Sequence, residues 1–113
     1  MARYSFPVGL FHPLPHVLGP ARADGFAVVL LNFGEPANND LVVPAAIEAI
    51  HNLRLPGGRG VLFHGAASLP VAMALAHAVA HLYQFVACYD PKISRYVVVI
   101  SHAAGMRPGD LLL

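Results

Sequence analysis

Residues 65–92 have the sequence GAASLPVAMALAHAVAHLYQFVACYDPK, which places a helical pattern directly before a strand pattern. Ser68 is a suitable N-cap and Pro70 is tolerated in a first turn, so we expect a helix that continues to about Tyr83. The β-branched and aromatic residues of 85–90 then predict a buried strand. A helix joined so directly to a strand predicts a helix packed against a sheet.

Segments on both sides of this stretch supply further strands and one more helix. Residues 26–33 form a continuous apolar run, which is typical of a strand buried on both faces. A short turn through Pro91 and Ser94 predicts that strands over 85–90 and 95–101 pair as an antiparallel hairpin. We expect the remaining elements in this order: a short strand near Tyr4, a loop over 34–40, a helix over 43–53 with Pro44 in its first turn, a turn over 55–60, a strand over 61–64, and an edge strand over 109–113.

This order of elements predicts an α/β fold, a small mixed-sheet sandwich with two helices. The length of 113 residues fits a single domain over 1–113. Within it, the Pro-rich segment 1–24 has no assigned structure beyond the strand near Tyr4.

The chain carries few charges for its length. Hydrophobic residues make up 57% of it and charged residues 12%, against a usual charged share of about 25%. No Lys, Arg, Asp or Glu occurs between Arg59 and Asp90, although this span contains a whole predicted helix. An isolated domain normally places charges on the outer face of such a helix. We therefore expect a second copy of the chain to cover this face in a two-fold homodimer.

The uncharged span also raises the alternative of a membrane helix, which needs about 20 apolar residues. Gly65, Ser68, Pro70 and three histidines interrupt the span, and this favours a protein without a membrane span. Prolines break the apolar N-terminal segment, which is therefore a poor secretion signal. The single cysteine, Cys88, excludes an internal disulfide and fits a small core residue in a reducing compartment. These observations predict a cytoplasmic protein.

Net charge limits the kind of partner. The chain has a net charge of +1 and a pI near 8.0, so it lacks the broad basic surface that binds DNA or long RNA. Phosphates would bind at a few points, and this favours a compact anionic ligand.

Two histidines, a carboxylate and a cation form the first candidate cluster. His77 and His81 lie four residues apart and so project from one face of the predicted helix. Asp90 ends the next strand, at the sheet edge where functional groups gather in α/β folds, and Lys92 adds a cation. We expect the four side chains to meet in one place. The simpler alternatives are a chance pair in a chain with seven histidines and an ordinary Asp-Pro turn.

A second candidate set would bind phosphate. Gly65 to Ser68 lies where a strand turns into a helix, so backbone N–H groups and the helix dipole would face a bound anion. The segment is not a Walker loop, and it also fits a simple tight turn. Ser101 and His102 close the second strand of the hairpin, and we expect their hydroxyl and imidazole beside this turn.

Together these motifs resemble the Csx-three family of CRISPR-associated ring nucleases. The resemblance covers roughly the second half of the chain: the run 65–77, His81, the strand ending in Asp-Pro-Lys at 92, the strand ending in Ser-His at 102, and Gly109-Asp110. It implies a fold related to the CRISPR-associated Rossmann-like (CARF) sensors and a homodimer. It also implies binding and manganese-dependent cleavage of cyclic tetra-adenylate, the second messenger of type III CRISPR systems. In such proteins ligand and catalytic cluster can lie on different faces, so that cleavage needs further association of dimers.

The resemblance further implies a role for each candidate residue. Catalysis falls to His77, His81, Asp90 and Lys92, with Mn2+ held by His77, His81 and Asp90, and ligand binding falls to His64, Gly65, Ser68, Ser101 and His102. The chain departs from the family in having no Arg in the turn over 64–68, and it has Lys92 where Arg is common. Both departures remove a bidentate contact to phosphate.

The side chains of the first candidate cluster are of the types that can cleave a phosphodiester by proton transfer. An imidazole titrates near neutrality, so one of His77 and His81 can take the proton of a ribose 2′-hydroxyl and the other can protonate the leaving oxygen. Lys92 would stabilise the added charge, and Asp90 would either orient an imidazole or bind a divalent metal with both histidines. Three functions stay open: a ring nuclease, a non-catalytic sensor or sink that binds cyclic oligoadenylate or short oligoadenylate RNA and regulates a partner, and a metal-binding structural dimer.

Overall fold

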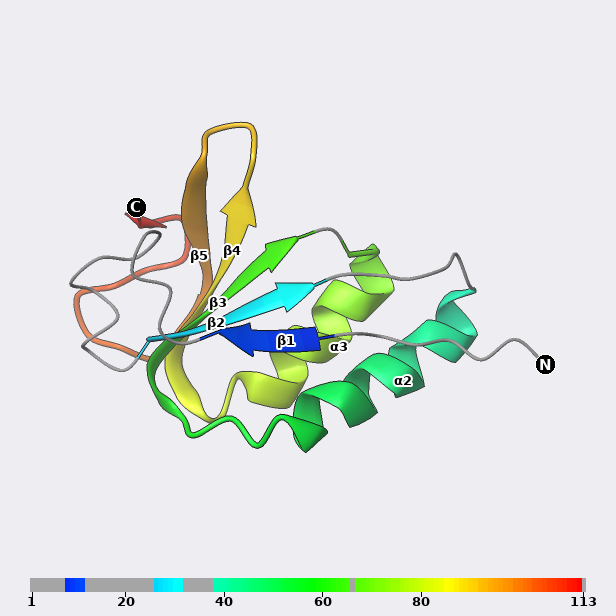
Figure 1. Ribbon diagram of the computed structural model, residues 1–113. Helices are drawn as coiled ribbons and strands as arrows, with labels where there is room; N and C mark the ends of the chain where they lie inside the picture. Colours follow the sequence, from blue (N-terminus) through cyan, green and yellow to red (C-terminus); the bar gives the residue numbers. More distant parts are fainter. Residues whose placement is uncertain (1–7, 12–25, 32–37, 66, 113) are drawn as a thin grey trace.

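The computed structural model describes residues 8–11, 26–31, 38–65 and 67–112 of the chain. Their strands form one six-stranded sheet whose order follows the sequence, β1-β2-β3-β4-β5-β6 (Figure 1). The central strands β2, β3 and β4 are parallel, and β1, β5 and β6 each pair antiparallel with their neighbours. The elements are β1 (Val8–Phe11), β2 (Phe26–Leu31), α2 (Asn39–Asn52), β3 (Gly58–Gly65), α3 (Leu69–Val79), β4 (Tyr83–Asp90), β5 (Arg95–Ser101) and β6 (Leu111–Leu112). The small mixed α/β domain predicted from the sequence is confirmed.

Helices α2 and α3 lie side by side on one face of the sheet (Figure 1). Each connects two neighbouring parallel strands, and right-handed crossovers of this kind place both helices on the same face. Each helix buries a stripe that repeats every fourth residue: Val42, Ala46 and Ile50 on α2, and Val71, Leu75 and Val79 on α3. The other face of the sheet carries a second buried cluster, formed by Phe26, Val28, Leu62, Phe85, Ala87, Tyr96 and Val98.

Helix α2 begins at Asn39, before the predicted start at residue 43, so Pro44 lies inside the helix instead of in its first turn. The earlier start has a packing reason. Val42 is only 4% exposed and extends the buried stripe by one turn towards the N-terminus. The loop predicted over 34–40 is therefore helical from Asn39 onward, and residues 32–37 lie outside the described part of the chain.

Helix α3 ends at Val79 and not near Tyr83, because Tyr83 is the first residue of β4. Tyr83 is 3% exposed, pairs with Gly58 of β3, and accepts a hydrogen bond on its hydroxyl from the Gly57 N–H at 3.2 Å. The same pairing explains why β3 begins at Gly58, within the turn predicted over 55–60. Burial of one aromatic side chain thus sets both boundaries.

The antiparallel hairpin of β4 and β5 is confirmed, with Asp90 opposite Arg95 and a register shift between Val86 and Ala87. The edge strand predicted over 109–113 is also confirmed, as β6. The strand predicted near Tyr4 lies outside the described residues, whereas β1 was not predicted. In the described ranges, every helix is too short or too polar to cross a membrane.

Candidate functional site

The candidate residues lie at two opposite edges of the sheet, because of the directions in which the strands and α3 run. Strands β2, β3 and β4 run parallel, so all three begin at one edge of the sheet, the amino edge, and end at the other, the carboxyl edge. Helix α3 leaves β3 at the carboxyl edge and returns to the start of β4 at the amino edge (Figure 1). Residues at the N-terminus and the C-terminus of α3 therefore lie at opposite edges.

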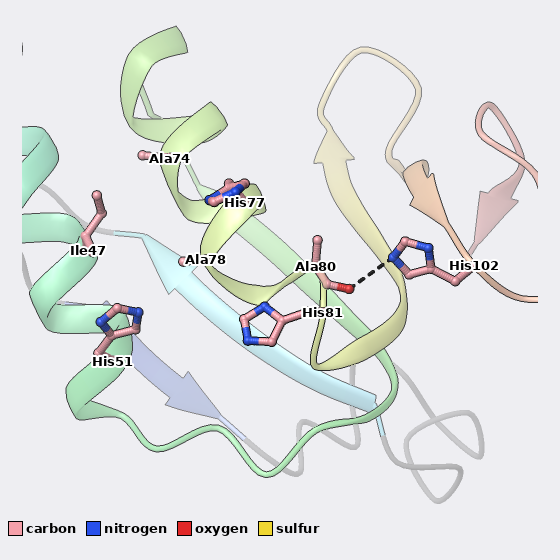
Figure 2. Close-up of a pocket in the computed structure, with 8 residues that line it drawn as sticks. All are labelled: Ile47, His51, Ala74, His77, Ala78, Ala80, His81 and His102. Carbon is pink, nitrogen blue, oxygen red and sulfur yellow. Dashed lines mark hydrogen bonds between the residues drawn. The ribbon is translucent and has the colours of Figure 1, made fainter.

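Four histidines line one pocket at the amino edge (Figure 2). His51 lies in the last turn of α2, His77 lies in the last turn of α3, His81 follows α3, and His102 follows β5. The pocket has a volume of about 440 Å³, and its other lining residues are Ile47, Ala74, Ala78 and Ala80. We call it the histidine pocket. His77 and His81 share it as their spacing predicts.

His102 is fixed in the histidine pocket by the backbone of α3. Its Nε2 lies 3.1 Å from the carbonyl oxygen of Ala80, the C-cap residue of α3 (Figure 2). A carbonyl oxygen only accepts, so Nε2 carries the proton and Nδ1 of the neutral ring is an acceptor. The pocket is thus lined by one imidazole of defined tautomer, His102, and by three further imidazoles, a type of side chain that can exchange protons with a ligand.

Asp90 and Lys92 do not lie in the histidine pocket. Asp90 is the last residue of β4, at the carboxyl edge, and its Oδ1 accepts a hydrogen bond from the Lys92 N–H at 2.9 Å in the turn to β5. The eight residues of β4, at roughly 3.3 Å each, separate its two ends by roughly 23 Å. The expectation that His77, His81, Asp90 and Lys92 meet in one place is therefore not met within one chain.

The distance between the two edges also decides whether His77, His81 and Asp90 of one chain can bind one manganese ion. His77 and His81 reach the amino edge and Asp90 the carboxyl edge, so these donors of one chain do not fit a shared metal ion. Across the described ranges, no group of three or more His, Cys, Asp or Glu side chains could hold a metal. Only donors from two chains could complete a site of this composition.

Ser101 and His102 lie at the amino edge, not beside the Gly65 turn as expected. The reason is the direction of β5, which runs antiparallel to β4 and brings Ser101 opposite Phe85. The Ser101 hydroxyl donates to the Met106 carbonyl at 2.7 Å and accepts from the Ala103 N–H at 3.1 Å. Ser101 thus closes the loop after β5, while His102 belongs to the histidine pocket.

The carboxyl edge brings together the other ligand-binding candidates, His64, Gly65 and Ser68. Gly65 has a φ of +128°, and a Cβ there would overlap the Leu31 carbonyl oxygen, so only glycine fits this turn. Ser68 is the predicted N-cap, since its Oγ accepts from the Val71 N–H at 3.3 Å. Its hydroxyl donates to Asn39 Oδ1 at 2.7 Å, which ties the N-termini of α3 and α2 together.

An apolar pocket of about 160 Å³ lies beneath this turn. Its lining includes Gly65, Ala72, Leu75, Cys88 and Tyr89. Burial raises the pKa of the Cys88 thiol, so the group stays protonated and is a poor nucleophile. The small core role predicted for Cys88 agrees with this environment.

The sequence reasoning missed His51, Tyr89 and Tyr96. His51 could have been found from the topology, because two parallel crossover helices end at one edge and each carries a histidine in its last turn. Tyr89 and Tyr96 are directly opposite each other in the predicted hairpin, and this register places them on one face.

A family model described as CRISPR-associated protein (Cas_csx3) matches residues 36–112. No curated protein and no solved structure matches the chain. The matched range includes α2, α3 and strands β3 to β6. It therefore contains every residue of the histidine pocket, and His64, Gly65, Ser68, Asp90 and Lys92 at the carboxyl edge.

Proposed function

Because the chain belongs to the Csx-three (Cas_csx3) family of CRISPR-associated proteins, we propose that it binds cyclic tetra-adenylate and cleaves the ring, which would end type III CRISPR signalling. The observation that carries the proposal is the histidine pocket, which lies entirely within the matched range. A cytoplasmic location, expected from the sequence, is part of the same proposal.

The histidine pocket can supply proton transfer. In the proposed step, one imidazole of the pair His77 and His81 takes the proton of a ribose 2′-hydroxyl, and the oxygen attacks the adjacent phosphorus. The bond from phosphorus to the 5′-oxygen breaks, and the second imidazole protonates that leaving oxygen. The products are a 2′,3′-cyclic phosphate and a 5′-hydroxyl on a linear chain, without consumption of water.

Two chains are needed to bring the two edges together. The carboxyl edge, with His64, Gly65 and the α3 N-terminus, is suited to hold phosphate, and the histidine pocket of a second chain would cleave it. Asp90 and Lys92 of the ligand-binding chain would then lie beside the ring near the partner's imidazoles. In this arrangement His77 and His81 of one chain and Asp90 of the other could hold a manganese ion between them.

We also propose that the chain forms a homodimer, and the evidence for it is the apolar outer face of α3. Leu69 is 73% exposed and Met73 65% exposed, and both lie on this uncharged helix. Apolar side chains exposed on a helix that carries no Lys, Arg, Asp or Glu favour coverage by a second copy.

A non-catalytic sensor or sink is the second candidate function. The separation of His81 and Asp90 favours it, because a chain that never associates through both edges would hold the ring without cleaving it. Retention of intact cyclic tetra-adenylate by the wild-type dimer would support this candidate.

Mixing of variants tests the proposal. His81→Ala and Asp90→Ala should each lose most cleavage, on the order of a hundredfold, while binding the ring. If the two edges of different chains act together, an equal mixture of the two variants should recover part of the activity, since some contacts pair an intact pocket with an intact carboxyl edge. Tyr83→Phe, which removes one hydroxyl from the core and leaves all four histidines of the pocket in place, is the control. Full activity in both single variants would contradict the proposal.

A further inference from the structure

The face of the sheet opposite the helices holds a cluster of one histidine and two tyrosines at the carboxyl edge. The His64 ring stacks on Tyr89 with a centroid distance of 4.2 Å and an interplanar angle of 20°. His64 Nδ1 lies 3.1 Å from the Tyr96 hydroxyl oxygen, and the rings of Tyr89 and Tyr96 meet edge to face at 5.3 Å. We call these residues the Tyr–His cluster.

The direction of the hydrogen bond follows from the burial of Tyr96. This side chain is 1% exposed, and His64 is its only hydrogen-bond partner in the described part of the chain. Burial raises the pKa of the Tyr96 hydroxyl, and the neighbouring Tyr89 raises it further, so the phenol keeps its proton at neutral pH. A buried O–H needs an acceptor, and the acceptor at hand is Nδ1 of His64.

The consequence is a defined tautomer of His64. A neutral imidazole that accepts at Nδ1 carries its proton on Nε2. Within the described residues, the His64 ring makes no second hydrogen bond, so this N–H is left for a group outside them. The stacked Tyr89 ring restricts rotation of the imidazole, and His64 is half-buried at the end of β3 next to the Gly65 turn.

We propose that Tyr96 is a positioning residue that holds His64 as an Nε2–H donor to an acceptor oxygen of a ligand bound at the carboxyl edge. The ligand class is a phosphodiester, whose non-bridging oxygens accept from the Nε2–H of the imidazole. This inference rests on the proposed function for the identity of the ligand, cyclic tetra-adenylate. Tyr96 acts only through His64 and touches neither phosphate nor base.

A double-mutant cycle with a matched control tests the role of Tyr96. Tyr96→Phe removes one oxygen atom and keeps the buried ring, and Tyr83→Phe makes the same change in another buried tyrosine, whose hydroxyl is bonded to the Gly57 N–H at the amino edge. By calorimetry, Tyr96→Phe should weaken binding of cyclic tetra-adenylate about tenfold, and Tyr83→Phe should leave it within about twofold. In a His64→Ala background, Tyr96→Phe should cause no further loss, because its effect passes through the imidazole.

The ¹⁵N signals of the His64 ring give a readout that does not depend on the ligand. In the wild type they should show one tautomer with the proton on Nε2, and in Tyr96→Phe they should shift towards a mixture, whereas Tyr83→Phe should leave them unchanged. Unchanged His64 signals in Tyr96→Phe, or equal affinities for the two Phe variants of a protein that binds the ring, would overturn the inference. A wild type with the expected tautomer but no affinity for cyclic tetra-adenylate would instead overturn the proposed function.

Discussion

The Gly65→Ala variant tests how closely the turn at Gly65 packs against β2 at the carboxyl edge. Gly65 has a φ of +128°, a conformation that costs a residue with a Cβ about 1–3 kcal/mol. The added Cβ would also overlap the Leu31 carbonyl oxygen, and relief of a contact with backbone atoms adds about 1–3 kcal/mol. We expect the free energy of unfolding to fall by about 3 kcal/mol, which for a domain of this size lowers Tm by about 12 °C.

Gly105→Ala is the control, measured by the same urea and thermal unfolding. Gly105 also has a positive φ, +81°, but a Cβ there meets nothing within 4 Å. The control therefore carries only the conformational cost, about 1 kcal/mol or about 4 °C in Tm. If the free energy of unfolding fell equally in the two variants, the close approach of β2 to the Gly65 turn would be refuted. In that case the turn could not be regarded as a rigid support for a ligand.

Three further changes have defined outcomes. His51→Ala should slow cleavage by on the order of tenfold to a hundredfold with unchanged affinity, measured by single-turnover kinetics, because His51 lines the histidine pocket and not the carboxyl edge; a change in affinity alone would contradict this. If the proposed homodimer forms, Met73→Lys should give a monomer in light scattering, since it places a charge on an exposed apolar face, whereas Glu48→Lys on the polar side of α2 should not. Burial raises the pKa of the Tyr83 and Tyr96 hydroxyls above the ordinary value of 10.0, because the folded protein favours the protonated phenol. The stability that this preference contributes is fully present below pH 10 and is lost as the pH rises through the pKa values of the folded protein. Urea unfolding should show this loss, and it should be smaller in the Tyr83→Phe/Tyr96→Phe protein.

Local signals in the sequence predicted several elements of the fold correctly. Ser68 was predicted as an N-cap and is one, because the hydroxyl and the N–H that it caps are three residues apart. The short turn between β4 and β5 predicted the antiparallel hairpin for the same reason. The end of α3 was predicted too late, since the burial of Tyr83 depends on pairing with Gly58, which is distant in the sequence.

The grouping of the candidate residues could not be predicted from spacing alone. Asp90 follows His81 closely in the sequence, yet the whole length of β4 separates them. The antiparallel direction of β5 places His102 in the same pocket as His77, and the parallel course of α2 and α3 places His51 there. Each of these placements depends on the order and direction of strands in the sheet. The spacing of His77 and His81, a local feature, was a correct guide to their shared pocket.

Mass spectrometry of cyclic tetra-adenylate after incubation with the wild-type protein tests the central claim most directly. Attack by a 2′-hydroxyl opens the ring without adding water, so the account predicts a linear product of the same mass as the ring that separates from it by chromatography and carries a 2′,3′-cyclic phosphate. The product should also form with manganese present and should be lost in the His77→Ala/His81→Ala protein. A ring that stays intact under all conditions, or a first product heavier by one water, would contradict the proposed chemistry of the histidine pocket.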